Sequence, residues 1–422
     1  MINSSPNYKR TKLACYSAYF TMSSIFSLPP LLFITLRNMY NISYTLLGTL
    51  VLINFCTQLI IDLIFTFFSK KFNVAKVVKI MPLITSLGPG IYAVVPTMFP
   101  SYAYTGLVIG TLIFSVSAGL SEVLLSPIIA AIPSDNPQKD MSTLHSLYAF
   151  GFFFVVVVAS LALHIFGSEN WIYITLFFAV LPIISAIQFM VSPFPPMSNE
   201  DEAATAGTNR KNYAGLFLCI CCIFFGSCAE NTMANWISSY AQNALGIAKT
   251  IGDIFGMSVF AVLLGCTRIL YGKYGKNIYK VLLTGMIGSV VCYVVAGLST
   301  NNMVAFVACV LIGPFSAMLW PGTLLMMEEN LPGVGVAAYA VMAASGDMGA
   351  SVAPQLMGIV IDKVSASDFA LKAGEVLNIS AEQVGLKTGM LITAVFPLIG
   401  AVLVVAAIRY FKNRNVGTIN CN

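Results

Sequence analysis

The chain has 422 residues, of which 58% are hydrophobic and only 9% are charged, and its formal net charge is +5. Soluble domains carry about 25% charged residues, so this composition excludes a water-soluble globular domain. It predicts an all-α membrane protein, because only structures whose backbone hydrogen bonds close internally can cross a bilayer and the apolar runs here have helical length.

Twelve apolar runs are long enough to cross a bilayer core about 30 Å thick, which takes about 20 residues of helix. The first run is expected to be an uncleaved span, because it continues to about residue 36, beyond the length of a signal-peptide core. Pro127, Gly226 and Pro354 are positions where long runs could break. The predicted spans cover residues 12–36, 44–68, 76–96, 102–132, 142–166, 171–191, 212–238, 250–272, 279–299, 303–327, 335–361 and 388–411.

A single polar segment divides the chain. Residues 192–212 read SPFPPMSNEDEAATAGTNRKN, in which proline, serine and charged residues replace the aliphatic ones. This segment is predicted to be a cytoplasmic linker between two six-helix halves, 1–191 and 213–422. The ends of the fourth and tenth runs, LSEVLLSPIIAAIPSDN and LWPGTLLMMEENLPGVG, weakly resemble each other. A six-helix repeat is typical of transporters whose binding site lies between the two halves.

Basic residues orient the predicted helices. With a cytoplasmic N-terminus and twelve spans, 17 of the 22 lysines and arginines fall on the inner side and 5 on the outer side. Cytoplasmic loops of membrane proteins are enriched in these residues. Both termini are therefore predicted to be cytoplasmic, in a multi-pass protein of the cell membrane. The positive net charge follows from this topology and does not indicate nucleic-acid binding.

The sequence predicts neither an enzyme nor a metal or cofactor site. Nine of the ten cysteines fall in predicted spans, and CICC at 219–222 has no partner ligands nearby in a chain with two histidines. These cysteines are interpreted as small helix residues. No G-x-x-x-x-G-K-[ST] motif, nucleophile elbow or pair of catalytic carboxylates is found. Active transport would therefore draw on an ion gradient.

Three acidic residues, Glu122, Glu230 and Asp347, lie deep in predicted spans. An ionised side chain facing lipid at that depth costs at least about 2.5 kcal/mol. Each is therefore expected to face a cavity or a partner, and each is a candidate for proton coupling. The alternative is a permanently protonated carboxyl that bonds a neighbouring helix. Asp62 and Arg268 lie nearer membrane edges and are candidate gating residues, with helix capping or snorkelling as the alternative.

Polar and aromatic side chains near these acids are typical of a sugar or polyol site. Amides bond hydroxyl groups in both directions, and aromatic rings pack on the apolar faces of sugars. Hydrogen bonding between helices is the alternative for each residue. Trp320, followed by Pro321, is also predicted to mark a bend. The predicted substrate-binding residues are Asn54, Gln58, His145, Tyr148, Asn231, Trp236 and Trp320.

Three stretches carry a family resemblance: EVLLSPIIAAIPSDN followed by STLHSLYAFG, CAENTMANWISSY, and GDMGASVAPQLMGIVID. Over nearly its whole length the sequence resembles a major facilitator superfamily transporter, and more narrowly the fucose-permease-type branch of bacterial sugar permeases. The resemblance implies two pseudo-symmetric six-helix bundles with a cavity lined by helices 1, 2, 4, 5, 7, 8, 10 and 11.

The same resemblance implies roles for individual residues. Glu122 matches the fourth-helix glutamate of the proton-coupled sugar site, whereas the first span has no acid where that branch has an aspartate. Glu230 lies in a segment that resembles the G-x-E stretch of the seventh helix, with Cys228 in place of the glycine. Asp62 is interpreted as the remnant of the superfamily's loop motif between helices two and three.

The sequence therefore predicts a secondary active transporter that moves a small polar solute, a sugar or sugar-like compound, by alternating access and with proton coupling. Its expected partners are the solute, protons and membrane lipids, and it is expected to act as a monomer. Two alternatives stay open. One is an efflux transporter for drugs or metabolites, and the other is a nutrient sensor that uses the same scaffold without translocation.

Overall fold

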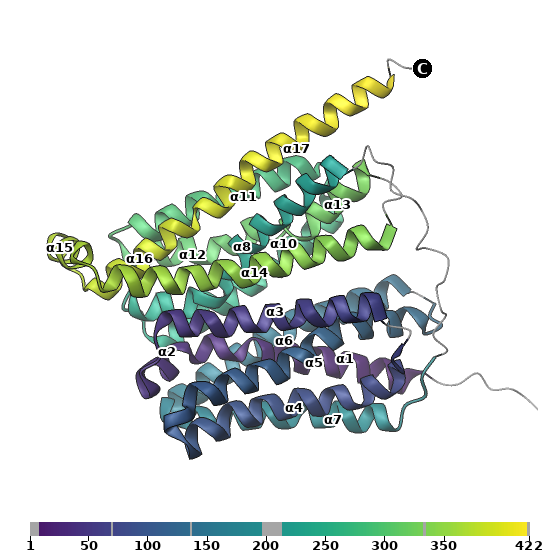
Figure 1. Ribbon diagram of the computed structural model, residues 1–422, viewed down its shortest axis with the longest axis horizontal. Helices are drawn as coiled ribbons and strands as arrows, with labels where there is room; N and C mark the ends of the chain where they lie inside the picture. Colours follow the sequence, from purple (N-terminus) through teal and green to yellow (C-terminus); the bar gives the residue numbers. More distant parts are fainter. Residues whose placement is uncertain (1–7, 69–70, 136, 196–212, 332–334, 420–422) are drawn as a thin grey trace, which may run out of the picture. The chain divides into compact units, whose positions relative to one another are not determined.

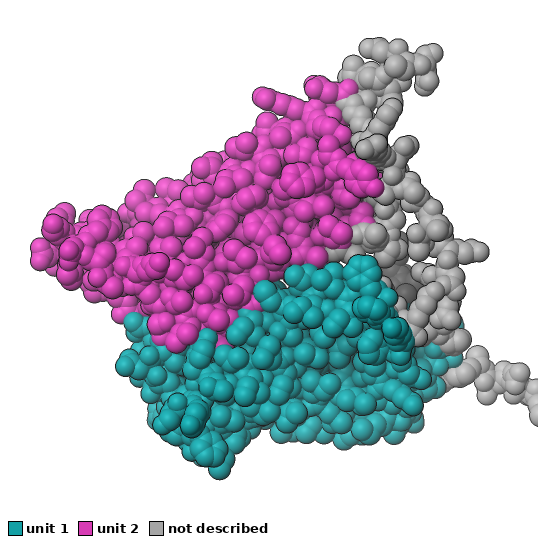
Figure 2. Space-filling model, viewed as in Figure 1, with its two compact units in different colours: residues 1–42, 53–200 teal, residues 43–52, 201–422 magenta. Residues whose placement is uncertain are grey.

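The computed structural model describes residues 8–68, 71–135, 137–195, 213–331 and 335–419, and within these ranges all regular structure is helical (Figure 1). The chain forms two compact units, one of residues 1–42 and 53–200 and the other of residues 43–52 and 201–422 (Figure 2). Residues 43–52 are thus grouped with the second unit, which the predicted division at 192–212 did not anticipate. Most of that predicted linker, residues 196–212, lies outside the described ranges.

The first unit contains the helices that precede residue 200. Helix α3 also contributes its first turns to the second unit. The helices are α1 (Lys9–Phe26), α2 (Leu28–Tyr40), α3 (Tyr44–Phe68), α4 (Val74–Met98), α5 (Ala103–Ala131), α6 (Pro137–Phe166) and α7 (Trp171–Met190), with short 3-10 turns at Pro100–Tyr102 and Ser168–Asn170.

The second unit contains the remaining helices, including a seven-residue π-helical stretch, Gly252–Ser258. Its other helices are α8 (Tyr213–Asn243), α9 (Lys249–Ile251), α10 (Val259–Tyr274), α11 (Ile278–Leu298), α12 (Asn302–Ser316), α13 (Pro321–Asn330), α14 (Gly335–Ser365), α15 (Asp368–Leu377), α16 (Ala381–Thr393) and α17 (Val395–Ile419).

Membrane spans account for most of these helices. In the part of the chain that the structure describes, eleven helical segments are long and apolar enough to cross a bilayer. They correspond to eleven of the twelve predicted spans. The remaining predicted span, 335–361, is the 31-residue helix α14, which is long enough but less apolar because it carries Asp347, Gln355 and Asp362.

Several spans are built from two helices rather than one. The first breaks at Ser27, where Pro29 and Pro30 open α2, because proline suits the first turn of a helix and cannot continue a preceding one. The tenth breaks between Ser316 and Pro321, so the predicted bend beside Trp320 is confirmed. The breaks considered at Pro127, Gly226 and Pro354 are absent, since α5, α8 and α14 each run through these positions.

The core of the first unit lies where α1, α4 and α5 meet. Small buried residues on α1, including Ala14, Cys15 and Ala18, let the larger side chains of α5, such as Leu125 and Ile128, approach the helix closely. Such small residues are the usual means by which helices associate in a membrane, where the lipid is as apolar as the protein. The unit is therefore held by close helix packing around α1.

Residues 43–52 belong to the second unit because they are bonded to α14, α8 and α16. The Asp362 carboxylate accepts hydrogen bonds from the backbone N–H groups of Tyr44 at 3.1 Å and Thr45 at 2.5 Å. It therefore satisfies free donors at the start of α3 and complements the positive end of that helix. The Tyr44 hydroxyl donates to Glu382 at 2.5 Å, and the Asn243 amide donates to the Tyr44 hydroxyl at 2.8 Å.

In the first unit, α1 and the start of α6 are joined outside the membrane span by Asp140. Its carboxylate forms an ion pair with Lys12 and accepts a hydrogen bond from Ser134 at 2.5 Å, and its backbone carbonyl accepts one from Tyr16 at 3.2 Å. Hydrogen bonds from Lys12, the larger effect, and from Ser134 hold the pKa of Asp140 below its ordinary value of 3.8. The ionised form is thus favoured in the folded protein.

This lowered pKa predicts a pH-dependent contribution to stability. Because the folded pKa lies below the unfolded one, the contribution should be complete well above about pH 4 and should disappear as the pH falls through the folded pKa. We expect Asp140→Asn to melt at a lower temperature than wild type at pH 7. The difference should narrow below about pH 4. A difference that stays constant from pH 3 to pH 7 would show that the carboxylate charge contributes nothing.

Candidate functional site

Glu122 lies on α5, on the exposed surface of the first unit, although the residues around it on the helix are largely buried. It is close enough to Asp62 of α3 and Tyr19 of α1 for their charges or dipoles to interact. A carboxylate within electrostatic range of a second carboxyl group and a phenol can bind a proton and can accept hydrogen bonds from hydroxyl groups. Two of the predicted residues, Glu122 and Asp62, are thus brought together.

An aromatic surface adjoins this carboxyl pair. The ring of Tyr148 on α6 lies 6.2 Å from Tyr19 and 6.5 Å from Phe26, and Phe26 meets Phe55 of α3 edge to face at 5.4 Å. Tyr148 is 36% exposed. An accessible ring flanked by other rings is suited to packing on the apolar face of a sugar or a similar solute.

The position of Tyr148 depends on a glycine one turn further along α6. A Cβ on Gly151 would overlap the backbone carbonyl oxygen of Phe20 on α1. The same two helices are tied by Ser23 and Ser24, whose hydroxyls donate to the backbone carbonyls of Tyr148 at 2.6 Å and Gly151 at 3.0 Å. Gly151 therefore lets α6 approach α1 closely enough to place Tyr148 against the rings of α1.

Gly151→Ala should consequently be destabilising. The added methyl group would meet the rigid backbone of α1 and would have to push α1 and α6 apart. Such overpacking costs about 1–3 kcal/mol in well-packed proteins. Gly90→Ala on α4 is the matched control, because a Cβ there meets open space and alanine favours helix over glycine. Thermal unfolding in detergent checks the pair, and equal melting temperatures for the two variants would contradict the close-contact argument.

Asn54 and Gln58 lie on one face of α3, as their spacing predicts, and both are buried at 8% and 6% exposure. The Asn54 side-chain oxygen accepts hydrogen bonds from Ser115 of α5 at 2.6 Å and from Gln58 at 3.3 Å. These bonds join α3 to α5. The structure therefore places both residues in the buried contact between α3 and α5, where Asn54 bonds the neighbouring helix and Gln58 bonds Asn54.

In the second unit, Glu230 on α8 is bound by Arg268 on α10. The Arg268 Nη2 lies 2.8 Å and 3.1 Å from the two carboxylate oxygens, and its Nε donates to the Ala317 carbonyl at 2.8 Å. Ala317 follows the end of α12 in the broken tenth span, so its carbonyl is available for this bond. Two residues predicted for separate roles, proton coupling and gating, thus form one ion pair.

Trp320 and Asp347 lie near each other in the second unit. The Trp320 indole packs against Gly346 of α14, where a Cβ would overlap the indole nitrogen. Asp347 is the next residue and is half-buried. The broken tenth span therefore contributes two groups to this unit, the Ala317 carbonyl beside Arg268 and the Trp320 ring beside α14.

The other predicted residues on α8, Asn231 and Trp236, form hydrogen bonds within the second unit. The Asn231 amide donates to Ser227 at 3.1 Å on the same helix. Trp236 is fully buried, and its indole N–H donates to the Pro354 carbonyl of α14 at 3.1 Å. The side chain of His145 lies outside the described part of the chain.

Two features were missed from the sequence. Tyr19 and Phe26 lie seven residues apart on α1, hence on one helical face, a spacing that could have indicated the aromatic surface. The second is a buried ion pair in the π-helical stretch, where Asp253 is fully buried and bonded to Lys249 at 2.8 Å and to Ser238. The i, i+4 spacing of Lys249 and Asp253 could have indicated it.

A metal centre finds no support in the described residues, where no group of three or more histidine, cysteine, aspartate or glutamate side chains is placed to hold an ion. In the first unit, the carboxyl groups of Glu122 and Asp62 can bind a proton and hydrogen-bond hydroxyl groups, and the exposed ring of Tyr148 can pack on an apolar face.

Comparisons with known proteins agree with this architecture. The model of the Major Facilitator Superfamily matches residues 14–354, while no curated protein sequence matches the chain. Among solved structures, a bacterial homolog of the human lysosomal transporter Spinster aligns with a TM-score of 0.79 at 14% identity, over 96% of this chain and 98% of that one.

Two sugar transporters also share the fold. The D-xylose-proton symporter aligns with a TM-score of 0.71 at 15% identity, over 93% of this chain and 97% of that one. The fucose:proton symporter of E. coli aligns with a TM-score of 0.58 at 13% identity, over 95% and 99%. At these identities the likeness concerns the fold, while the family model covers most of the sequence. The chain belongs to the Major Facilitator Superfamily.

Proposed function

We propose that the protein is a secondary active transporter that moves a small polar solute, a sugar or sugar-like compound, across the cell membrane by alternating access with proton coupling. One observation carries the proposal: Glu122 is exposed within the membrane span of α5 and interacts electrostatically with Asp62 and Tyr19, and the accessible ring of Tyr148 packs next to Tyr19. Membership of a transporter superfamily supplies the translocation pathway that such a surface would serve.

Glu122 is the better candidate for the coupling proton. Two carboxyl groups that lie together repel each other when both are ionised, so one proton bound by Glu122 and Asp62 relieves that repulsion. Glu230, in contrast, has both of its carboxylate oxygens engaged by Arg268 and would have to give up this ion pair to become protonated. We therefore assign proton binding to Glu122, with Asp62 as its electrostatic partner, and a structural or gating role to the Glu230–Arg268 pair.

The chemistry of the surface supports a hydroxylated solute. Carboxylate oxygens accept hydrogen bonds from sugar hydroxyls, a phenol can both donate and accept them, and Tyr148 supplies a ring for the apolar face. Two of the similar structures are proton symporters for sugars by name, D-xylose and fucose. This combination favours a sugar over the hydrophobic substrates expected of drug efflux.

We also propose how the protein is oriented in the membrane and that it functions as a single chain. We propose that both termini lie in the cytoplasm, because basic residues are in excess on one side of the predicted spans. The protein is proposed to work as a monomer, since each chain has both units of the fold. Asp347 is a second candidate for proton binding, because it is a half-buried carboxyl in α14 of the second unit, within a predicted span.

Uptake into proteoliposomes tests the function. We expect one class from a panel of labelled pentoses, hexoses, deoxyhexoses, polyols and nucleosides to accumulate when the lumen is more alkaline than the outside. Without the pH gradient the same solute should only equilibrate. A solute that raises the melting temperature but never crosses the membrane would instead indicate a sensor. Selective transport of hydrophobic dyes would indicate drug efflux.

A further inference from the structure

The short helix α15 exposes four large apolar side chains outside the membrane spans. Among its ten residues, Phe369 is 62% exposed, Leu371 58%, Val376 84% and Leu377 53%. The residues it buries are Ala370 and Gly374. Figure 1 shows α15 at the end of the bundle where α14 and α16 meet. The exposed apolar surface contributed by Phe369, Val376 and Leu377 points to a surrounding other than water on their side of the helix.

The exposed apolar and charged side chains of α15 lie mostly on different faces of the helix. At 3.6 residues per turn, Phe369, Val376 and Leu377 fall within an arc of about 100°. Asp368, Lys372 and Glu375 fall within a separate arc of about 60°. Leu371 lies almost opposite Phe369. The helix is therefore amphipathic, with one apolar edge and one charged edge.

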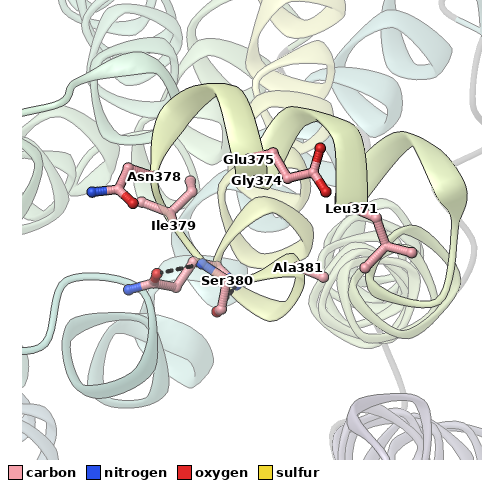
Figure 3. Close-up of a pocket in the computed structure, with 8 residues that line it drawn as sticks. Leu371, Gly374, Glu375, Asn378, Ile379, Ser380 and Ala381 are labelled. Carbon is pink, nitrogen blue, oxygen red and sulfur yellow. Dashed lines mark hydrogen bonds between the residues drawn. The ribbon is translucent and has the colours of Figure 1, made fainter.

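The side of α15 away from Phe369 borders a polar hollow. A cavity of about 460 Å³ lies between α15 and the start of α16, lined by Leu371, Glu375, Asn378, Ser380 and Gln383 among others (Figure 3). In Figure 3 the Ser380 backbone N–H bonds the Gln383 side chain, at 2.9 Å. The side of α15 that borders this cavity is polar enough to contact water, whereas the opposite side consists of apolar side chains.

Both ends of α15 are fixed by capping. At its start the Ser367 hydroxyl accepts the Ala370 N–H at 3.3 Å. At its end Asn378 takes the left-handed conformation, with φ 55°, and the Ile379 N–H bonds the Gly374 carbonyl at 3.0 Å. A ten-residue helix is nevertheless marginal in water, and most helical stability comes from burial of an apolar face. Ala370 and Gly374 supply little of that burial, so the Phe369 edge needs a further contact.

The position of α15 in the chain identifies that contact. Two residues separate it from the end of α14, and three separate it from α16, where the membrane span Ala381–Asn413 begins. The helix is thus tethered at the membrane surface. We propose that α15 is an interfacial helix that lies in the lipid headgroup region. Phe369, Val376 and Leu377 enter the acyl boundary, and Asp368, Lys372 and Glu375 face water.

Spin labels on the two faces test this placement in the full-length protein, reconstituted in phosphatidylcholine nanodiscs. The matched pair is Phe369→Cys and Leu371→Cys, which replace two similarly exposed apolar residues of the same helix. Unsubstituted protein taken through the same labelling supplies the background from the native cysteines. The label at 369 should be several-fold more accessible to oxygen, which partitions into lipid, than the label at 371, and several-fold less accessible to water-soluble nickel chelate.

Two further positions fix the rotation of the helix. Val376→Cys should behave like the label at 369 and Glu375→Cys like the label at 371, although these residues are adjacent in sequence. High nickel accessibility at 369 and 376 would place the apolar edge in water and overturn the proposal. Low accessibility to both reagents there would mean that protein covers the edge, which also overturns it.

Discussion

Replacing Glu122 with glutamine should abolish solute accumulation driven by a pH gradient while leaving solute exchange intact. Glutamine keeps the size of the side chain and can donate a hydrogen bond, so it resembles the protonated acid, but it cannot release a proton. The carrier should then bind and exchange solute across the membrane without coupling. In proteoliposomes we expect counterflow near the wild-type rate and a final internal concentration no higher than the external one.

Glu230→Gln is the matched control for this experiment. It removes a carboxylate from a membrane span of the second unit, but one that is already held by Arg268. We expect this variant to lose stability and transport rate, yet to retain accumulation in whatever transport remains. If Glu230→Gln is the uncoupled variant and Glu122→Gln concentrates solute as wild type does, the proton carrier is in the second unit and Glu122 is a helix-packing carboxyl.

Arg268→Gln should destabilise the second unit. The guanidinium bonds both oxygens of Glu230 and the Ala317 carbonyl, so its loss leaves a carboxylate and a helix-end carbonyl without those donors. The pair is only partly buried, with 39% exposure for the Arg268 side chain and 16% for Glu230. We therefore expect a coupling energy of about 2 kcal/mol, below that of a fully buried pair.

A double-mutant cycle measures this coupling. The double variant Glu230→Gln, Arg268→Gln should be less destabilised than the sum of the single variants, because it leaves no uncompensated charge. The cycle compares the melting temperatures of wild type, the two single variants and the double variant, all measured in one detergent at one pH. Additive effects would show that the ion pair contributes nothing to stability, and the interaction between α8 and α10 would then rest on packing alone.

The fold was largely predictable because hydropathy reports it directly. Eleven predicted spans coincide with apolar helices, and the superfamily resemblance is confirmed by the family model. The bend before Pro321 was predictable, since proline favours the first turn of a new helix. The continuity of α14 through Pro354 was not, because membrane helices can tolerate proline where neighbouring groups satisfy the backbone, and the neighbours of a helix are not visible in its sequence.

The candidate site was predictable as a set of residues but not as a set of contacts. Glu122 and Glu230 were identified by their positions deep within predicted spans. What each can do depends on the side chains of neighbouring helices that pair with it. Arg268 was placed near a membrane edge, yet its long side chain reaches Glu230. Asn54 and Gln58 share a helical face as predicted, but their partner is Ser115 of α5, which spacing along α3 cannot reveal. The periodicity of a sequence predicts which residues share a helical face. It does not predict which residues of other helices that face contacts.

The most direct test of proton coupling is the movement of protons with the solute. Proteoliposomes with a pH-sensitive dye in the lumen receive a gradient of the solute identified by the uptake panel, with no pH gradient imposed. We expect solute entry to acidify the lumen of wild-type vesicles, and Glu122→Gln vesicles to exchange solute without acidification. Solute entry into wild-type vesicles with no change in luminal pH, or equal acidification with Glu122→Gln, would contradict this expectation.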